Sequence, residues 1–293
     1  MREIVRIGDL VGTYHAADGT RGKRIAYVFG NSGQVPRDGH GALIARACDG
    51  LAARGYPCFR FDLPALGDSA GELPNHVEKL YSFVADGGYV DVTLELARTV
   101  RDRLGAEGVV VGGLCGAAVT GIYAADRAPD LVRGLVLLEP EMFRTAPRGQ
   151  GARPHTSGET TNRLERLTSK LFSYWGWMTV LTMENEYAKY VPLPRRAILK
   201  VLMDRAELPS VANVQLVEAW QRVVARRTPT LVVTAKGKVR EVFFDRINRA
   251  ALARVPTSSM EHVRLEGTNH LLTTGGAIER VTALVESWSD RLA

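Results

Sequence analysis

The strongest chemical signal in the sequence is a cysteine set among small residues. The stretch GGLCGAAVT, residues 112–120, follows an apolar run at residues 109–111. A nucleophile on a tight strand-to-helix turn needs such neighbours, because larger side chains would collide with the turn. At a helix start the dipole favours a thiolate, and the backbone N–H of Gly116 can face an oxyanion. The pattern predicts Cys115 as a nucleophile. The alternative is an inert cysteine whose glycines serve only helix–strand packing.

One of the six histidines lies where a general base is expected. His270 ends the stretch EGTNH, just after a predicted strand at residues 261–267 and before the last predicted helix. The other five precede that position, and His262 lies inside the strand. Because the carboxyl ends of parallel strands share one edge of a sheet, an imidazole there can reach the nucleophile. His270 is therefore the predicted base.

Strands and helices alternate along most of the chain. Buried strands are predicted at residues 24–30, 56–62, 108–113, 131–140, 228–235 and 261–267. Helices are predicted at 41–54, 92–104, 115–125 and 278–288, from apolar residues that recur every three or four positions. Strands separated by helices of this length pair in parallel, with helices on both faces of the sheet. The expected fold class is α/β.

The turn around Cys115 resembles the nucleophile elbow G-x-S-x-G of the α/β-hydrolase superfamily, with cysteine for serine and Ala117 for the last glycine. FGNSG, residues 29–33, stands where that family often has its oxyanion loop. FDLPALGDSAG, residues 61–71, is similar to the family turn D-x-x-G-x-G-x-S, with Ala65 in place of a glycine. A weaker resemblance is to hydrolase-like proteins of exopolysaccharide and exosortase systems. The resemblance implies a catalytic triad and an oxyanion hole formed by Gly116 with Asn31 or Ser32.

The acid of that implied triad has three candidates. The family usually places an aspartate in the turn after residues 228–235, where this chain has AKGK with Lys238. Glu241, three residues later, is the first candidate. Glu139 and Glu141 follow the preceding strand, an alternative position in the family, and rank next. A Cys–His dyad is also open, because a cysteine depends less on an oriented imidazole than a serine does.

Between residues 141 and 227 the alternation stops. An exposed loop at 144–163 is followed by predicted helices at 164–183, 195–205 and 211–224, the last with Ser210 as N-cap. This region is predicted to be a helical lid inserted into a hydrolase core made of residues 1–140 and 228–293. Its apolar stretch either packs on the core or lines a pocket for an acyl group. The predicted substrate-binding residues are Phe172, Trp175 and Trp177, and Tyr174 and Met178 lie beside them.

Composition narrows the class of protein. The chain has 293 residues and a net charge of +6, with its basic residues scattered rather than gathered in a stripe, which argues against nucleic-acid binding. Three cysteines without CxxC spacing argue against a disulfide framework or a zinc site and fit the cytoplasm. The longest charge-free apolar stretch, residues 171–183, is too short to cross a bilayer, and the first residues lack the apolar core of a signal peptide. No metal or cofactor is expected.

These observations predict an enzyme that moves acyl groups through a covalent thioester on Cys115. With water as acceptor it is an ester or thioester hydrolase. With an alcohol, amine or thiol it is an acyltransferase, to which a thioester intermediate is well suited. The basic surface fits an anionic carrier of the acyl group, such as a carrier protein's phosphopantetheine arm or coenzyme A. A hydrolase-fold binding protein without catalytic activity is the third reading. The sequence leaves the acyl group, the acceptor and the oligomeric state open.

Overall fold

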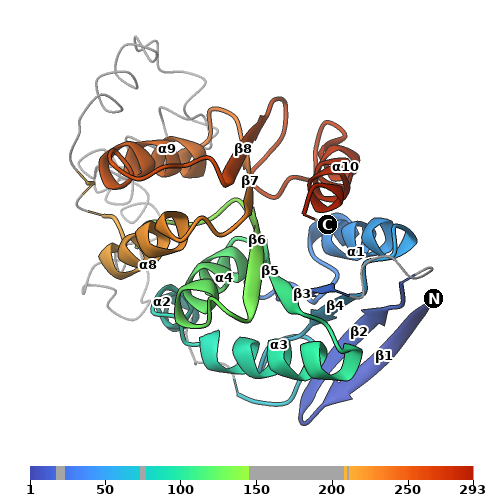
Figure 1. The fold of residues 1–293 in the computed structure, drawn as a ribbon. Coiled ribbons are helices and arrows are strands. Elements are labelled where there is room, and N and C mark those ends of the chain that lie inside the picture. Colours follow the sequence, from blue (N-terminus) through green and yellow to red (C-terminus); the bar gives the residue numbers. More distant parts are fainter. Residues whose placement is uncertain (18–23, 73–76, 145–207, 210, 293) are drawn as a thin grey trace, which may run out of the picture.

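An eight-stranded sheet forms the centre of the molecule (Figure 1). The computed structural model describes residues 1–17, 24–72, 77–144, 208–209 and 211–292. The strand order is β1-β2-β4-β3-β5-β6-β7-β8. The strands are β1 (Arg2–Ile7), β2 (Leu10–His15), β3 (Ile25–Phe29), β4 (Cys58–Phe61), β5 (Gly108–Leu114), β6 (Val132–Leu138), β7 (Thr230–Ala235) and β8 (Met260–Leu265).

The sheet is parallel from β4 to β8, as the alternation of strands and helices predicts. Only β1 and β2 run antiparallel, β1 to β2 and β2 to β4. This hairpin was not among the predicted strands, because β1 reads REIVRI and is largely exposed, without the apolar run of a buried strand. The carboxyl ends of the parallel strands all lie at one edge of the sheet. The candidate site lies at this edge.

The sheet separates two apolar layers, and successive residues of each strand enter different layers. On β5, Val109 and Val111 pack with one layer and Val110 with the other. On β6, Leu137 belongs to the first layer and Leu138 to the second. This period of two, with both faces apolar, is why the central strands read as continuous hydrophobic runs.

Helices cover both faces of the sheet (Figure 1). On one face α1 and α10 pack against each other, and on the other lie α3, α4, α8 and α9. The described helices are η1 (His40–Ala42), α1 (Leu43–Ala53), α2 (Val77–Ala85), α3 (Val90–Leu104), α4 (Gly116–Arg127), α8 (Val214–Ala225), α9 (Val239–Ala251) and α10 (Ala277–Asp290). None of these described helices has the length and apolar character needed to cross a membrane.

The described helix of the predicted lid is α8; residues 141–144, 208–209, 211–213 and 226–227 of this region are described as well. The helix begins at Val214, three residues after the predicted start, and is capped by Asn213, whose side chain accepts a hydrogen bond from the backbone of Leu216. Trp220 of α8 is fully buried, and the helix packs on α4 and α9. The rest of the lid prediction lies outside the described residues, with Ser210 and the substrate-binding candidates Phe172, Trp175 and Trp177.

Candidate active site

Cys115 stands between β5 and α4 in a backbone conformation that side chains rarely adopt. Its φ is 57° and its ψ is −109°, and its N–H donates to the carbonyl of Leu138 at 2.8 Å, which ties the turn to β6. Gly113 has a φ of 139°, and a Cβ there would lie 2.6 Å from the Cβ of Ala117. Small residues are thus required on both sides of Cys115, as the sequence pattern predicts for a strained nucleophile turn.

The predicted oxyanion donors lie beside this turn. The backbone N–H of Gly116 acts on the Cys115 sulfur and lowers the pKa of the thiol. The loop after β3 runs past it, since a Cβ on Gly116 would lie 4.0 Å from the backbone nitrogen of Gly33. Within the described part of the chain, the backbone N–H groups of Asn31 and Ser32 donate no hydrogen bond. Both residues are buried, so these donors are free to receive an oxyanion.

A fully buried carboxylate, Asp62, fixes the loop after β3. It accepts hydrogen bonds from the side-chain amide of Asn31 at 2.7 Å, from the backbone of Arg37 at 2.7 Å and from the backbone of Asp68 at 3.1 Å. The guanidinium of Arg37 forms an ion pair with it. Asn31 Oδ1 in turn accepts from the backbone N–H of Leu63 at 2.6 Å. The side chain of Asn31 is therefore structural.

The turn after β4, residues 61–71, contains Ala65 at a position where the resembled motif usually has a glycine. Ala65 has a φ of 66°, in the left-handed region, which is why glycine is the usual residue at this place in the resembled motif. Its N–H donates to the carbonyl of Ala70 at 3.0 Å, and a Cβ on Gly71 would lie 2.8 Å from the Ala65 nitrogen. The turn closes tightly on itself beside Asp62.

His270 follows β8 at the same edge of the sheet and is partly buried. Burial, and then the positive charge of Arg240, lower the pKa of His270 to about 4, so its imidazole is neutral at neutral pH. The charge of Glu141 acts on it in the opposite direction. Among the described residues no hydrogen bond joins His270 to Cys115. A neutral imidazole is the form that can accept a proton.

The three candidate acids have different surroundings. Glu241, the first choice from the sequence, accepts from the backbone of Gly237 at 3.1 Å and from the Arg264 guanidinium at 3.1 Å. No hydrogen bond connects it to His270 within the described residues. Burial raises the pKa of Glu241. Its position in the first turn of α9 suits a carboxylate that stabilises the helix N-terminus.

Glu139 and Glu141 follow β6, but only Glu141 reaches the cysteine. Glu139 is fully buried, and its side chain accepts a hydrogen bond from the backbone of Ala235, which ties the ends of β6 and β7 together. Glu141 Oε2 lies 3.7 Å from Cys115 Sγ and 2.8 Å from Arg240 Nη2. The carboxylate best placed to act on Cys115 and His270 is therefore Glu141.

Arg240 is the site residue that the sequence analysis missed. It is the second residue of α9, and its Nη2 lies 3.6 Å from Cys115 Sγ. The family pattern directs attention to an acid in this turn, so a basic residue there was passed over. One signal was present: a cation in the first turn of a helix is disfavoured by the helix dipole, so Arg240 breaks a local rule. Exceptions of this kind concentrate at functional sites.

The Cys115 thiol is protonated in this environment. Burial, with the nearby charge of Glu141, raises the pKa of Cys115 to about 11, although Arg240 and the Gly116 N–H act to lower it. The thiol of Cys115 and the imidazole of His270 are thus both neutral. Such a pair has to transfer a proton during the reaction, unlike a preformed thiolate–imidazolium pair.

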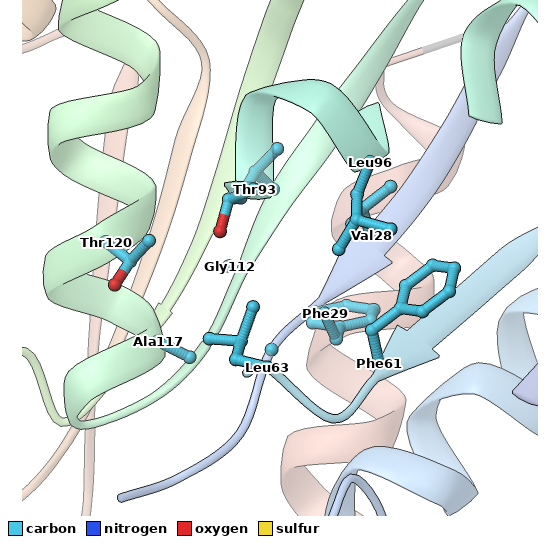
Figure 2. Close-up of a pocket in the computed structure, with 11 residues that line it drawn as sticks. Val28, Phe29, Phe61, Leu63, Thr93, Leu96, Gly112, Ala117 and Thr120 are labelled. Atoms are coloured by element: carbon cyan, nitrogen blue, oxygen red, sulfur yellow. The ribbon is translucent and has the colours of Figure 1, made fainter. Parts of the chain in front are cut away.

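A small cavity lies beneath the elbow (Figure 2). Its volume is about 10 Å³, enough for one water molecule. Figure 2 shows Thr93 and Thr120 beside it, and the Thr120 hydroxyl donates to the carbonyl of Gly116 at 3.0 Å. The other lining residues are Val28, Phe29, Gly30, Phe61, Leu63, Leu96, Val111, Gly112 and Ala117. An acyl chain does not fit there, so this cavity is not the substrate pocket.

The fold can be compared with known proteins. The sequence signature of the alpha/beta hydrolase family matches residues 39–283. The chain belongs to this family. Among proteins of curated function, none has significant sequence similarity to it. No group of three or more metal-binding side chains gathers in the described part of this alpha/beta hydrolase.

Solved structures agree with the fold at low sequence identity. A proline iminopeptidase from Mycobacterium smegmatis is 14% identical with a TM-score of 0.56, over 100% of this chain and 99% of that one. Est1E from Butyrivibrio proteoclasticus, solved with ferulic acid, is 11% identical with a TM-score of 0.55, over 99% and 98%. A thioesterase domain from the curacin biosynthetic pathway is 15% identical with a TM-score of 0.51, over 99% of each chain. At such identities the likeness concerns the fold.

Proposed function

We propose that this protein is an ester or thioester hydrolase that acts through an acyl-enzyme thioester on Cys115. One observation carries the proposal. Cys115 occupies the strained turn at the end of β5, with a φ of 57°, directly before the first residue of α4. Membership of the alpha/beta hydrolase family supports an enzymatic role, because its members place their nucleophile on this turn.

The proposed first half-reaction forms the acyl-enzyme. His270, neutral because its pKa is low, takes the proton of the Cys115 thiol. The sulfur then attacks the acyl carbonyl, and the oxyanion is bound by the N–H of Gly116 with that of Asn31 or Ser32. The intermediate collapses to a thioester, and the protonated His270 gives its proton to the leaving alcohol or thiol. His270 has to close on the sulfur for this transfer, and such contacts commonly tighten only when substrate binds.

In the second half-reaction His270 removes a proton from the acceptor. Water gives hydrolysis, which the family membership favours. An alcohol, amine or thiol gives transfer, which remains the alternative for this site. The partners are small acyl esters or thioesters, with an acyl group on a carrier protein or coenzyme A as a further expectation. Phe172, Trp175 and Trp177 stay the predicted acyl-binding residues.

We assign the triad's acid role to Glu141 rather than to Glu241 or Glu139. Glu141 acts electrostatically on His270 and lies 3.7 Å from the Cys115 sulfur. Within the described residues Glu241 has no hydrogen bond to Cys115 or His270 and accepts from Arg264 instead, and Glu139 accepts from the backbone of Ala235. Glu141→Gln should lower kcat/KM by about 10²-fold or more, as loss of acid–base assistance does. Glu241→Gln, the matched control, should leave kcat/KM within a factor of about three.

The decisive experiment is to trap the acyl-enzyme. The protein is mixed with p-nitrophenyl esters and acyl-thioesters from acetyl to octanoyl, quenched in acid and analysed by intact mass. We expect one acyl adduct, on the peptide that contains Cys115, in wild type and none in Cys115→Ala. Adding hydroxylamine or a thiol separates transfer from hydrolysis. A Cys115→Ala variant with wild-type turnover would exclude this mechanism, and a folded wild type without adduct or turnover would support a binding protein.

A further inference from the structure

The guanidinium of Arg240 lies against the sulfur of Cys115. We propose that Arg240 is a catalytic residue whose positive charge stabilises the Cys115 thiolate as it forms. This inference rests on the proposed function in one respect, since it takes the Cys115 sulfur as the reacting atom. It adds a charged side chain, from α9, to the nucleophile, base and backbone donors.

The geometry aims a fixed charge at the reacting atom. Arg240 Nη2 lies 3.6 Å from Cys115 Sγ and donates to Glu141 Oε2 at 2.8 Å. Glu141 thereby holds the guanidinium beside the sulfur. When the thiol loses its proton, the negative charge appears next to an existing positive one, and in a partly buried site such an interaction is much stronger than in water.

The position of Arg240 is poor for a purely structural ion pair. It stands in the first turn of α9, where the helix dipole disfavours a cation. Its Nε is buried and, within the described residues, has no hydrogen-bond partner. A residue that only paired with Glu141 would gain nothing from this placement. A residue that meets a negative charge developing on Cys115 would be stabilised by that charge.

Two charged side chains dominate the surroundings of the sulfur at neutral pH. Burial would lower the pKa of Arg240, but the Cys115 sulfur and Glu141 outweigh it, so its pKa is raised and the group stays charged. Glu141, from the segment after β6, is the opposing charge. Lys238, at the N-cap of α9, acts on His270. The pKa values of His270 and His40 are both lowered, mainly by burial, so these two imidazoles are neutral.

The proton and charge balance is simple. The thiol proton passes to His270, which becomes an imidazolium, and the sulfur becomes a thiolate paired with Arg240. Attack forms the S–C bond and moves charge to the carbonyl oxygen. When the leaving group departs, it takes the proton from His270. Arg240 neither gains nor loses a proton, so it acts through charge alone.

The test measures thiol reactivity and needs no substrate. Wild type, Arg240→Gln and Arg240→Lys are treated with iodoacetamide at pH 7–11, and alkylation of the Cys115 peptide is followed by mass spectrometry. In this reaction the S–C bond forms and iodide leaves. We expect Arg240→Gln to raise the apparent pKa of Cys115 by at least one unit, which is about a tenfold slower reaction below that pKa. The apparent pKa of Cys115 in Arg240→Lys should lie between the values in wild type and in Arg240→Gln.

The matched control is Arg222→Gln on α8. Arg222 also pairs with a carboxylate, Asp126, but has no contact with the sulfur. Its loss should leave the alkylation profile unchanged. If Arg240→Gln does not fold, the test uses two other variants. Arg240→Lys is measured directly. Arg240→Ala is measured with millimolar ethylguanidinium, which should restore the reactivity of Cys115, and with an equal concentration of sodium chloride as the control.

An unchanged pH profile in folded Arg240→Gln, or in Arg240→Lys with no rescue of Arg240→Ala, would overturn the proposal. This outcome is separate from failure of the proposed function. If Cys115→Ala kept its turnover while Arg240→Gln slowed alkylation, the charge effect would stand without the covalent mechanism. If Cys115→Ala lost turnover and the alkylation profile did not move, only the role of Arg240 would be lost.

Discussion

Two loops that flank the elbow are fixed in different ways. The loop after β3, residues 30–37, is held from outside itself by the buried carboxylate of Asp62, which takes hydrogen bonds from Asn31 and Arg37. The loop after β8, residues 266–276, is held mainly from within, by bonds between Asn269 and Thr273. The first loop carries oxyanion donors, and the second carries His270. The loop with the backbone donors is therefore anchored by a buried carboxylate, whereas within the described residues no hydrogen bond joins the His270 imidazole to Cys115.

An imidazole without a firm partner suits a cysteine enzyme. A serine hydroxyl depends on an oriented base, whereas a thiol is a better acid and a stronger nucleophile. Here Glu141 is shared between the sulfur and Arg240, and it acts on His270 only through its charge. The loop after β8 can then carry His270 without a hydrogen bond that fixes its imidazole.

The largest effect on stability is expected at Asp62, the buried carboxylate that holds the loop after β3. Asp62→Ala removes a fully buried carboxylate and leaves Arg37, whose side chain is only 12% exposed, with the exposed carboxylate of Asp68 as its remaining ion-pair partner. Breaking one half of a buried pair typically costs about 3–5 kcal/mol of unfolding free energy. Urea denaturation measures it. Asp68→Ala is the control, since that carboxylate is 68% exposed and pairs with the same arginine; it should cost about 1 kcal/mol or less. Equal losses in the two variants would contradict the anchor role.

An intermediate effect concerns the titration of His270. Burial and the charge of Arg240 lower its pKa to about 4, so its ring should titrate near that pH by NMR, well below an ordinary histidine. The acid limb of kcat/KM should lie near the same pH, because the base works when deprotonated. Arg240→Gln should move the midpoint upward. A midpoint near 6.5 in wild type would show that the imidazole is solvated and not held in the site.

The sign of the accompanying stability effect follows from the same shift. The folded-state pKa of His270 is below its unfolded value of 6.5, so between these values the unfolded chain binds more protons. The contribution of His270 is therefore fully present above pH 6.5 and is lost as the pH falls toward 4. His262, whose pKa burial also lowers to about 4, contributes in the same direction.

The smallest effect is expected inside the loop after β8. Asn269→Ala removes the acceptor of the Thr273 N–H, at 3.0 Å, and should cost about 1 kcal/mol of stability. It should also lower kcat/KM, because the loop places His270. Asn248→Ala is the control: it removes a bond to Trp220 of 2.8 Å, away from the base, and should lower the melting temperature with kcat/KM unchanged. Unchanged kcat/KM in Asn269→Ala would mean that the loop's own bonds do not position the imidazole.

The fold could be read from the sequence where burial leaves a pattern. The strand β5 and the elbow after it are visible because both faces of the strand are apolar and the turn demands glycine. The edge strand β1 lacks that pattern, since most of its residues are exposed. The sequence analysis also does not predict the helix α9, whose buried face includes the charged residues Glu241 and Arg246.

The site could be read only in part, because contacts between distant segments leave no local trace. Nothing near Cys115 in the sequence indicates that Arg240, at the start of α9, reaches its sulfur. Nor does the sequence separate Glu141 from Glu139, two residues apart. The left-handed backbone of Glu139, with a φ of 49°, is a property of the folded chain. It turns Glu139 toward β7, and Glu141 lies nearer the elbow.

The place of β8 in the sheet has a consequence for local opening. β5, which leads to the nucleophile, is buried along its whole length between β3 and β6, whereas β8 is an edge strand that pairs only with β7. Edge elements open at lower free energy than central ones, so amide hydrogens of β8 should exchange well before those of β5. A brief detachment of the last strand would remove the base and leave the nucleophile turn intact. Catalytic competence would then be lost, on heating, before the core melts.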